Sequence, residues 1–215
     1  MNVVIDNLPA YLEGFGQTLS LLIISGIAAL VLGTVVAAMR ISPIPALSRV
    51  AAIYTELLRN TPLTLVLIFC AIILPYLGSE LPYFWAAIVG LTAYTSPFVA
   101  EALRSGINGV PIGQAEAARS LGFGFGQTVS LVVFPQAFRM VIPPLINVLI
   151  ALTKNTSVAG GLFVAELFGV GRTLANENGN AVVAVLLAVA TFYLIITIPL
   201  GILAGALEKR FAVQR

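Results

Sequence analysis

The sequence predicts an all-α membrane protein, built as a bundle of about five transmembrane helices. Hydrophobic residues make up 59% of its 215 residues and charged residues only 9%, whereas a soluble domain has about 25% charged residues. Several charge-free runs are also long enough to cross a bilayer. No segment alternates as barrel strands do, and an open sheet cannot span lipid because its backbone groups would lack partners.

The expected spans follow from these runs, since a transmembrane helix needs about 20 mostly apolar residues. The charge-free runs cover residues 14–39, 60–79, 81–100 and 178–207. A fifth candidate, 140–165, is interrupted only by Lys154, and we expect Pro143 and Pro144 to lie in its first turn, where proline is tolerated. The stretch 120–138, rich in Gly and polar residues, is expected to be interfacial and partly helical, leading into this fifth candidate.

The positions of the basic residues predict the orientation, because Lys and Arg concentrate on the cytoplasmic side. With the N-terminus outside and the C-terminus inside, all but Lys154 and Arg172 of the eleven basic residues fall inside: Arg40, Arg49, Arg59, Arg104, Arg119, Arg139, Lys209, Arg210 and Arg215. Five acids fall outside: Asp6, Glu13, Glu80, Glu166 and Glu177. We therefore predict one transmembrane domain, 1–215, with an inner loop at 104–139 and a polar outer loop at 161–180.

Lys154 is the one charge inside a predicted span, and it stands with Asn155, Thr156 and Ser157. A charged residue at the bilayer centre is costly and normally faces a cavity or a partner. The segment could line a cavity that receives a carboxylate. Alternatively, Lys154 could extend towards the interface or bond to backbone carbonyls. The residues alone leave both interpretations open.

We expect the polar and small residues in the other spans to hold the helices together. The hydroxyls of Thr92 and Ser96 favour hydrogen bonds between helices, and lining a solute cavity is the alternative. Small residues in the first and last spans predict close helix packing; they are Gly26, Ala29, Gly33, Gly201, Ala204 and Gly205.

The inner loop contains a short predicted helix, Gln114–Leu121, between Gly113 and Gly122. Glu116 near its start suits the positive end of the helix dipole, and Gly122 suits a left-handed helix stop. A helix of this length does not persist alone in water. It therefore needs a membrane surface or a groove on a protein partner.

The loop resembles the EAA loop of the permease subunits of ABC importers. Glu116-Ala117-Ala118, Gly122 and Pro135 have the family's spacing, while Val132 and Phe134 stand where the family usually has Ile and Leu. The resemblance implies that the short helix docks onto a separate ATPase. The residues implied in this coupling are Glu116, Ala117, Ala118, Leu121, Gly122 and Pro135.

Other segments resemble permeases for polar amino acids, and in particular the glutamate-uptake permeases of actinobacteria. They are RNTPLTLV at 59–66, TSPFVAEALRSGIN at 95–108, GQAEAARSLGFGFG at 113–126 and LTKNTS at 152–157. The resemblance implies the ABC type I importer fold, a multi-pass location in the bacterial plasma membrane, and glutamate as substrate, with glutamine or aspartate next and basic amino acids still open. The substrate-pathway candidates are Arg59, Thr92, Ser96, Lys154, Asn155, Thr156 and Ser157.

The resemblance also implies the partners: a dimer of ATPase subunits, a second permease chain that is a copy or a paralogue, an extracytoplasmic solute-binding protein, and membrane lipid. ATP and Mg²⁺ would bind to the ATPase, and we expect no cofactor or metal in this chain. The net charge of +2 makes nucleic acid an implausible partner.

The residues themselves argue against an enzyme. The chain has no His, one Cys and no GxxxxGK[ST] phosphate-binding loop, so it lacks common nucleophilic relays, metal-ligand clusters and an ATP site of its own. The alternatives are a secondary amino acid transporter or a channel subunit. Dependence of uptake on ATP would distinguish these from the importer.

Overall fold

The computed structural model describes residues 2–78 and 81–211, and within these ranges the regular structure is helical without any strand. Glu80 and Arg215, used above for the orientation, lie outside the described residues. The elements are α1 (Asn2–Asp6), α2 (Leu8–Arg40), α3 (Pro45–Arg59), α4 (Leu63–Ile68), the π-helical η1 (Phe69–Ile73), α5 (Leu74–Tyr76), α6 (Tyr83–Asn108), α7 (Ile112–Ser120), α8 (Phe125–Gln127), the π-helical η2 (Thr128–Val133), α9 (Phe134–Gly160), α10 (Leu167–Glu177) and α11 (Val182–Phe211).

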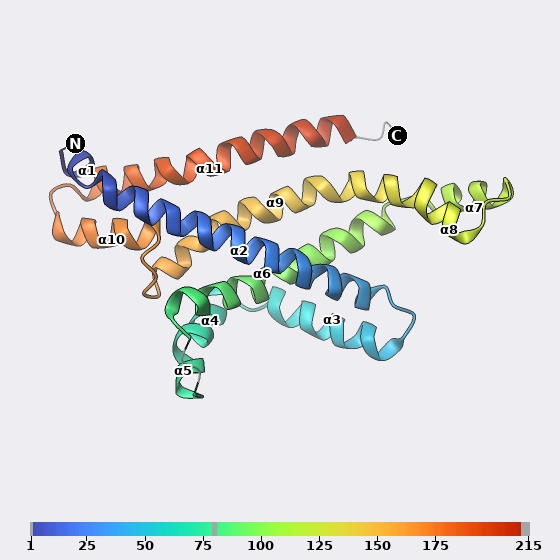
Figure 1. The fold of residues 1–215 in the computed structure, drawn as a ribbon, viewed down its shortest axis with the longest axis horizontal. Coiled ribbons are helices and arrows are strands. Elements are labelled where there is room, and N and C mark those ends of the chain that lie inside the picture. The colour runs from blue at the N-terminus through green and yellow to red at the C-terminus, as the bar shows by residue number, and fades with distance from the viewer. Residues whose placement is uncertain (1, 79–80, 212–215) are drawn as a thin grey trace.

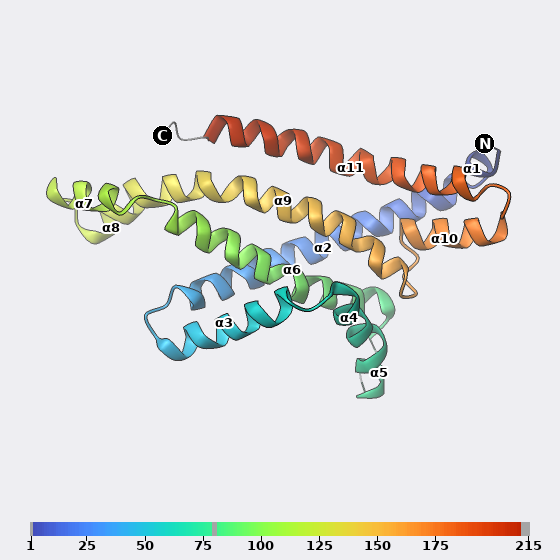
Figure 2. The same cartoon turned by 180° about the vertical axis from the view of Figure 1, so that it is seen from behind.

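Four helical segments of the described chain are long and apolar enough to cross a membrane: α2, α6, the continuous segment 125–160 that ends in α9, and α11. A fifth crossing is formed if the bent pair of α3 and α4–α5 counts as one span. Figures 1 and 2 show α2, α6, α9 and α11 running lengthwise, with α1 at one end of the bundle and α7 at the other. The prediction of about five spans is confirmed, and the N-out orientation stays a prediction.

Helices α2 and α6 approach each other closely at Gly33. A Cβ atom at this position would lie 2.6 Å from Val99 Cβ and 2.7 Å from the Ser96 carbonyl oxygen. The absent side chain therefore lets the two helices touch, as small residues do in membrane bundles. On α11, by contrast, Gly201 and Gly205 have open space around them, so the packing interpretation is wrong for them within this chain.

The second crossing differs from the predicted run 60–79. It begins at Pro45 with α3 and then bends by 102° into α4 and α5, which Figure 1 shows turning away from the long axis. Helix α3 is amphipathic: Ala51 is buried, whereas Arg49 and Glu56 are exposed. Because it contains charged residues, such a helix is not part of a charge-free run, although it can pack in a bundle through its apolar face.

Pro143 and Pro144 lie in the interior of α9, and the prediction of a first-turn position is wrong. The predicted interfacial stretch 120–138 is helical from Phe125 onward, and η2 joins α8 to α9 without a break. Membrane helices tolerate interior prolines because neighbouring helices and local π-type adjustments satisfy the freed backbone groups. The two prolines therefore do not mark the start of a span.

The α2–α6 contact predicts the effect of a single methyl group. Gly33→Ala should lower the stability of the bundle by about 1–3 kcal/mol, because the added carbon overpacks a backbone contact. Thermal unfolding in detergent would measure this change. Gly16→Ala, in the same helix with nothing near its Cβ, is the matched control and should not destabilise. Equal melting temperatures for Gly33→Ala and the unmutated protein would contradict the tight contact.

Candidate functional site

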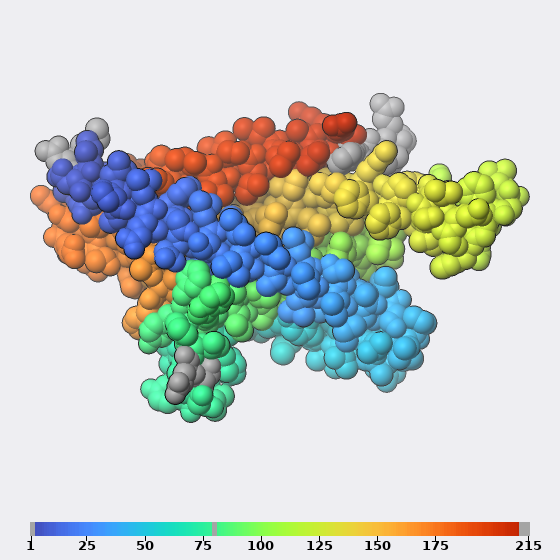
Figure 3. All heavy atoms as spheres, viewed as in Figure 1, coloured from blue at the N-terminus to red at the C-terminus, as the bar shows by residue number. Residues whose placement is uncertain are grey.

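The short helix α7 projects from the end of the bundle opposite the N-terminus (Figures 1 and 3). It spans Ile112–Ser120, close to the predicted Gln114–Leu121. Gly122 has φ +88°, and its N–H donates to the Arg119 carbonyl oxygen at 2.9 Å, while the Phe123 N–H donates to Ala118 at 3.1 Å. These two bonds form the glycine-dependent helix stop that the sequence predicts.

The surface of α7 and of the turn and short helix after it carries exposed apolar side chains. Ile112, Leu121 and Phe125 are 77%, 79% and 74% exposed. Of the coupling motif, Ala118 is buried, while Glu116, Ala117, Leu121, Gly122 and Pro135 are exposed. Exposed large apolar side chains gathered in one place mark a surface that a partner covers.

Arg59 ends α3 and is exposed. Its guanidinium carbon is 5.6 Å from the centre of the Phe98 ring, a cation–π contact. Phe98 precedes the end of α6 by ten residues, which is about 15 Å along the helix axis. The placement of Arg59 on the inner side stays a prediction, and the structure adds its contact with α6.

A cavity of about 400 Å³ opens between α6 and α9 next to this arginine contact. Phe98 contributes to its wall, and so do the polar side chains of Thr95, Asn147 and Asn155. Arg59 thus contacts Phe98, and Phe98 lines the same cavity as Asn155. Asn147 and Thr95 were missed by the sequence argument, although Asn147 lies two helical turns before Asn155 on one face of α9.

Lys154 faces a different space, a groove of about 300 Å³ formed by α9, α10 and α11. Ser157 and Tyr193 also line it, and the Ser157 hydroxyl donates to the Lys154 carbonyl oxygen at 2.7 Å. In the part of the chain that the structure describes, no carboxylate lies within ion-pair distance of Lys154. Thr156 is fully buried, and its hydroxyl bonds to the Thr153 carbonyl oxygen at 2.7 Å. The predicted polar segment is therefore divided between two sides of α9.

Thr92 and Ser96 line neither of these spaces. Ser96 is fully buried, with its hydroxyl 2.8 Å from that of Tyr54 in α3. The Tyr54 hydroxyl also donates to the Ala93 carbonyl oxygen at 3.1 Å. For Ser96 the structure thus shows the hydrogen bond between helices that the sequence favours.

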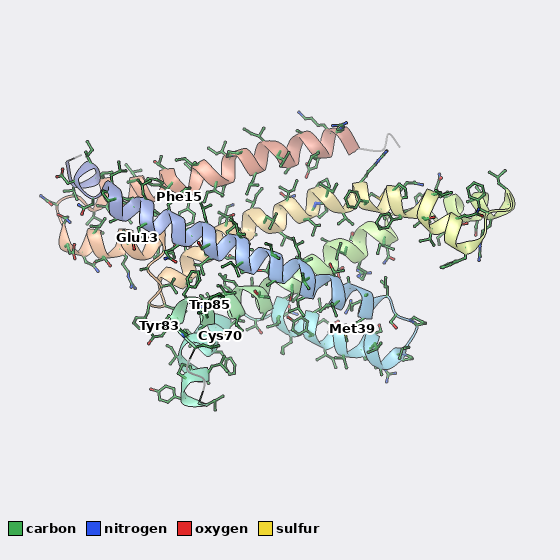
Figure 4. All side chains as sticks on the ribbon, in the orientation of Figure 1. Glu13, Phe15, Met39, Cys70, Tyr83 and Trp85 are labelled. Carbon is green, nitrogen blue, oxygen red and sulfur yellow. The ribbon has the colours of Figure 1, made fainter. Side chains whose placement is uncertain are left out.

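Glu166, counted as an outer-loop acid, is fully buried. Its carboxylate accepts hydrogen bonds from Thr18 and Tyr193, which lie far away in the sequence, so no local pattern signals the contact. The same region carries an aromatic contact between α2 and α11. Figure 4 shows Phe15 on the side of α2 that faces α11, and its ring centre lies 5.4 Å from that of Phe192.

Comparison with known proteins supports one family over nearly the whole chain. The sequence profile of the family described as "Binding-protein-dependent transport system inner membrane component" matches residues 19–213. The glutamate transport system permease protein GluC of Corynebacterium glutamicum is 42% identical over 96% of each chain. The probable glutamine ABC transporter permease protein GlnM of Bacillus subtilis is 41% identical over 98% of this chain and 97% of its own.

A solved structure supports the fold as well. A crystal structure described as that of an amino acid ABC transporter with histidines has a TM-score of 0.89 and 28% sequence identity, with 96% of each chain covered. The predicted ABC type I importer fold is therefore confirmed. The family match also removes the alternatives of a secondary transporter and a channel subunit.

Permeases of this family are non-catalytic and work with an ATPase and a solute-binding protein. The projecting helix with its glycine stop, the polar spaces inside a five-crossing bundle and the match over residues 19–213 lead to one assignment. This chain belongs to the family of binding-protein-dependent transport system inner membrane components, as a multi-pass permease subunit of an ABC importer in the bacterial plasma membrane.

Proposed function

We propose that this permease carries glutamate into the cell, with glutamine or aspartate as the next candidates. The observation that supports this most strongly is the 42% identity to a glutamate permease over 96% of both chains. The 41% identity to a probable glutamine permease supports an acidic or amide side chain in the substrate. In this family the solute-binding protein is a separate chain and does much of the selecting.

Two exposed cationic groups that border polar spaces fit an acidic amino acid. Arg59 lies beside the cavity between α6 and α9, and Lys154 lies in the groove on the opposite side of α9. Charged side chains at membrane depth face cavities and mark substrate pathways. In the proposed pathway these two cations attract the substrate's carboxylates, while the Asn155 amide and the Ser157 hydroxyl offer hydrogen bonds.

The exposed surface of α7 fits a groove on the ATPase. Ile112, Leu121 and Phe125 supply apolar contacts, and Glu116 and Ala117 lie exposed on the same short helix. ATP and Mg²⁺ would bind to the ATPase dimer, and its closure would move α7. The driving free energy comes from the different affinities of nucleotide for the two states of the transporter.

The remaining partners follow from the predicted orientation. With the N-terminus outside, α7 lies in the cytoplasm and α10 faces the solute-binding protein. A second permease chain, either a copy of this one or a paralogue, completes the membrane unit. The genes that flank this one would identify the binding protein, the ATPase and any paralogue.

The pathway proposal predicts the effect of removing the charge of Lys154. In reconstituted vesicles, Lys154→Met should raise the apparent KM for glutamate by about tenfold, since a charged hydrogen bond contributes about 1.5 kcal/mol or more. Lys209→Met, at the inner end of α11, is the control and should leave the KM unchanged. Unaltered affinity and rate in Lys154→Met would remove this residue from the pathway.

The coupling proposal predicts that Gly122→Asp separates ATP hydrolysis from transport. At φ +88° a side chain is strained by about 1–3 kcal/mol, so the helix stop should distort while membrane insertion stays intact. We expect stimulation of the ATPase by the loaded binding protein to fall about tenfold. Gly113→Ala, with open space at its Cβ, is the matched control. Normal stimulation in Gly122→Asp would count against the coupling role.

A further inference from the structure

Glu166 is a buried carboxylate for which the transport pathway gives no role. It is fully buried, and its Oε2 atom accepts hydrogen bonds from the Thr18 hydroxyl at 3.0 Å and the Tyr193 hydroxyl at 2.6 Å. Its Oε1 atom accepts the Gly169 N–H at 2.8 Å. Among residues 2–78 and 81–211, no Lys or Arg lies within ion-pair distance of it. A buried carboxylate is costly unless donors surround it, and here three donors do so.

Four helices converge on this one carboxyl group. Thr18 belongs to α2, Gly169 to α10 and Tyr193 to α11, and the Leu167 N–H donates to the Thr18 hydroxyl at 3.1 Å. The last residue of α9, Gly160, supplies the space, because a Cβ there would lie 1.9 Å from Glu166 Oε1. At the end of the bundle where α10 lies, this one carboxyl group is thus bonded to α2, α10 and α11 and packed against α9.

Helix capping explains only part of this arrangement. Glu166 is the N-cap of α10, and its Oε1 bond to Gly169 satisfies one of the free N–H groups of the first turn. Shorter residues such as Asp, Asn, Ser or Thr are the usual caps. The additional length of glutamate brings Oε2 to α2 and α11. Capping of α10 needs only the Oε1 bond, so it does not account for the two bonds to Oε2.

Those extra bonds connect the Lys154 groove with a second hollow beside α10. The Tyr193 ring forms part of the wall of the groove that holds Lys154 and Ser157. Helix α10 borders a surface cavity of about 300 Å³, together with Ala10 of α2. Glu166 lies between the two and is bonded to both sides. The hydrogen bonds of the Glu166 side chain therefore transmit a displacement of α10 to the wall of the Lys154 groove.

We propose that Glu166 is a positioning residue for transport, whose carboxylate joins α10 to α2 and α11 so that movement of α10 shifts the Tyr193 wall of the Lys154 groove. The solute-binding protein, docking on the α10 end, supplies that movement. The inference rests on the orientation and on the docking face given under the proposed function, and it does not depend on which amino acid is carried.

The test uses the assembled transporter in vesicles with its cognate binding protein, loaded with the amino acid that this protein binds. Thr18→Val removes one donor to Oε2 and keeps the shape, whereas Thr18→Ser keeps the hydroxyl and is the matched control. We expect Thr18→Val to reduce the stimulation of ATP hydrolysis by the loaded binding protein about tenfold. The assembled amount and the basal hydrolysis should match the unmutated complex, and Thr18→Ser should retain most of the stimulation.

Tyr193→Phe provides a second variant, since it removes the other donor to Oε2. Its loss of stimulation should combine with that of Thr18→Val less than multiplicatively, because both variants act on the same oxygen. Normal stimulation in Thr18→Val and Tyr193→Phe would overturn the proposal. The proposal would also be overturned if the loss of stimulation were explained by a smaller amount of assembled complex. An equal loss of stimulation in Thr18→Ser would overturn it as well.

A wrong assignment of glutamate as substrate and a wrong role for Glu166 would give different experimental results. If glutamate is the wrong substrate, the unmutated transporter is not stimulated by the binding protein in the presence of glutamate. The comparison between Thr18→Val and Thr18→Ser is then made with the amino acid that does stimulate it. The two proposals are therefore tested by different pairs of measurements.

Discussion

The bundle depends on the close contact between α2 and α6. Gly33 allows the α2 backbone to reach Val99 and the Ser96 carbonyl oxygen, and α6 in turn carries α3 on one side and α9 on another. In lipid the hydrophobic effect gives little drive for helix association, so close packing and hydrogen bonds between helices must supply it. The hydroxyl pair of Tyr54 and Ser96 lies in the same region and fixes α3 against α6. The contact of Arg59 with the Phe98 ring follows from this packing.

Helix α9 organises the polar interior. Asn155 and Asn147 face the cavity on the α6 side, while Lys154 and Ser157 face the groove on the α11 side. Adjacent residues on a helix point in directions about 100° apart, so a polar run in the sequence does not form one polar surface. A substrate that met both spaces would have to pass along α9, and the proposed pathway follows this helix.

Much of the architecture could be predicted because the bilayer restricts the choices. Four long apolar helices, the short helix before Gly122 and its left-handed stop all follow from local patterns of hydrophobicity and glycine. The second crossing could not be found in this way, since α3 carries Arg49 and Glu56 on its exposed face and a charge-free run misses it. The interior position of Pro143 and Pro144 depends on neighbouring helices. The burial of Glu166 depends on Thr18 and Tyr193, which no local pattern connects to it.

The continuous helix from Phe125 to Gly160 has a mechanical consequence. At 1.5 Å per residue it is about 54 Å long, and it begins beside α7 and ends against Glu166. Helix α7 and Glu166, at opposite ends of the bundle, therefore contact the same continuous helix, and η2 is the π-helical stretch within it. An extra residue in a helical turn changes the rotational phase of everything beyond it. A one-residue insertion or deletion within residues 125–160 would thus turn one end of this helix relative to the other by about 100°, so the length of the segment couples the orientation of α7 to that of the Glu166 site.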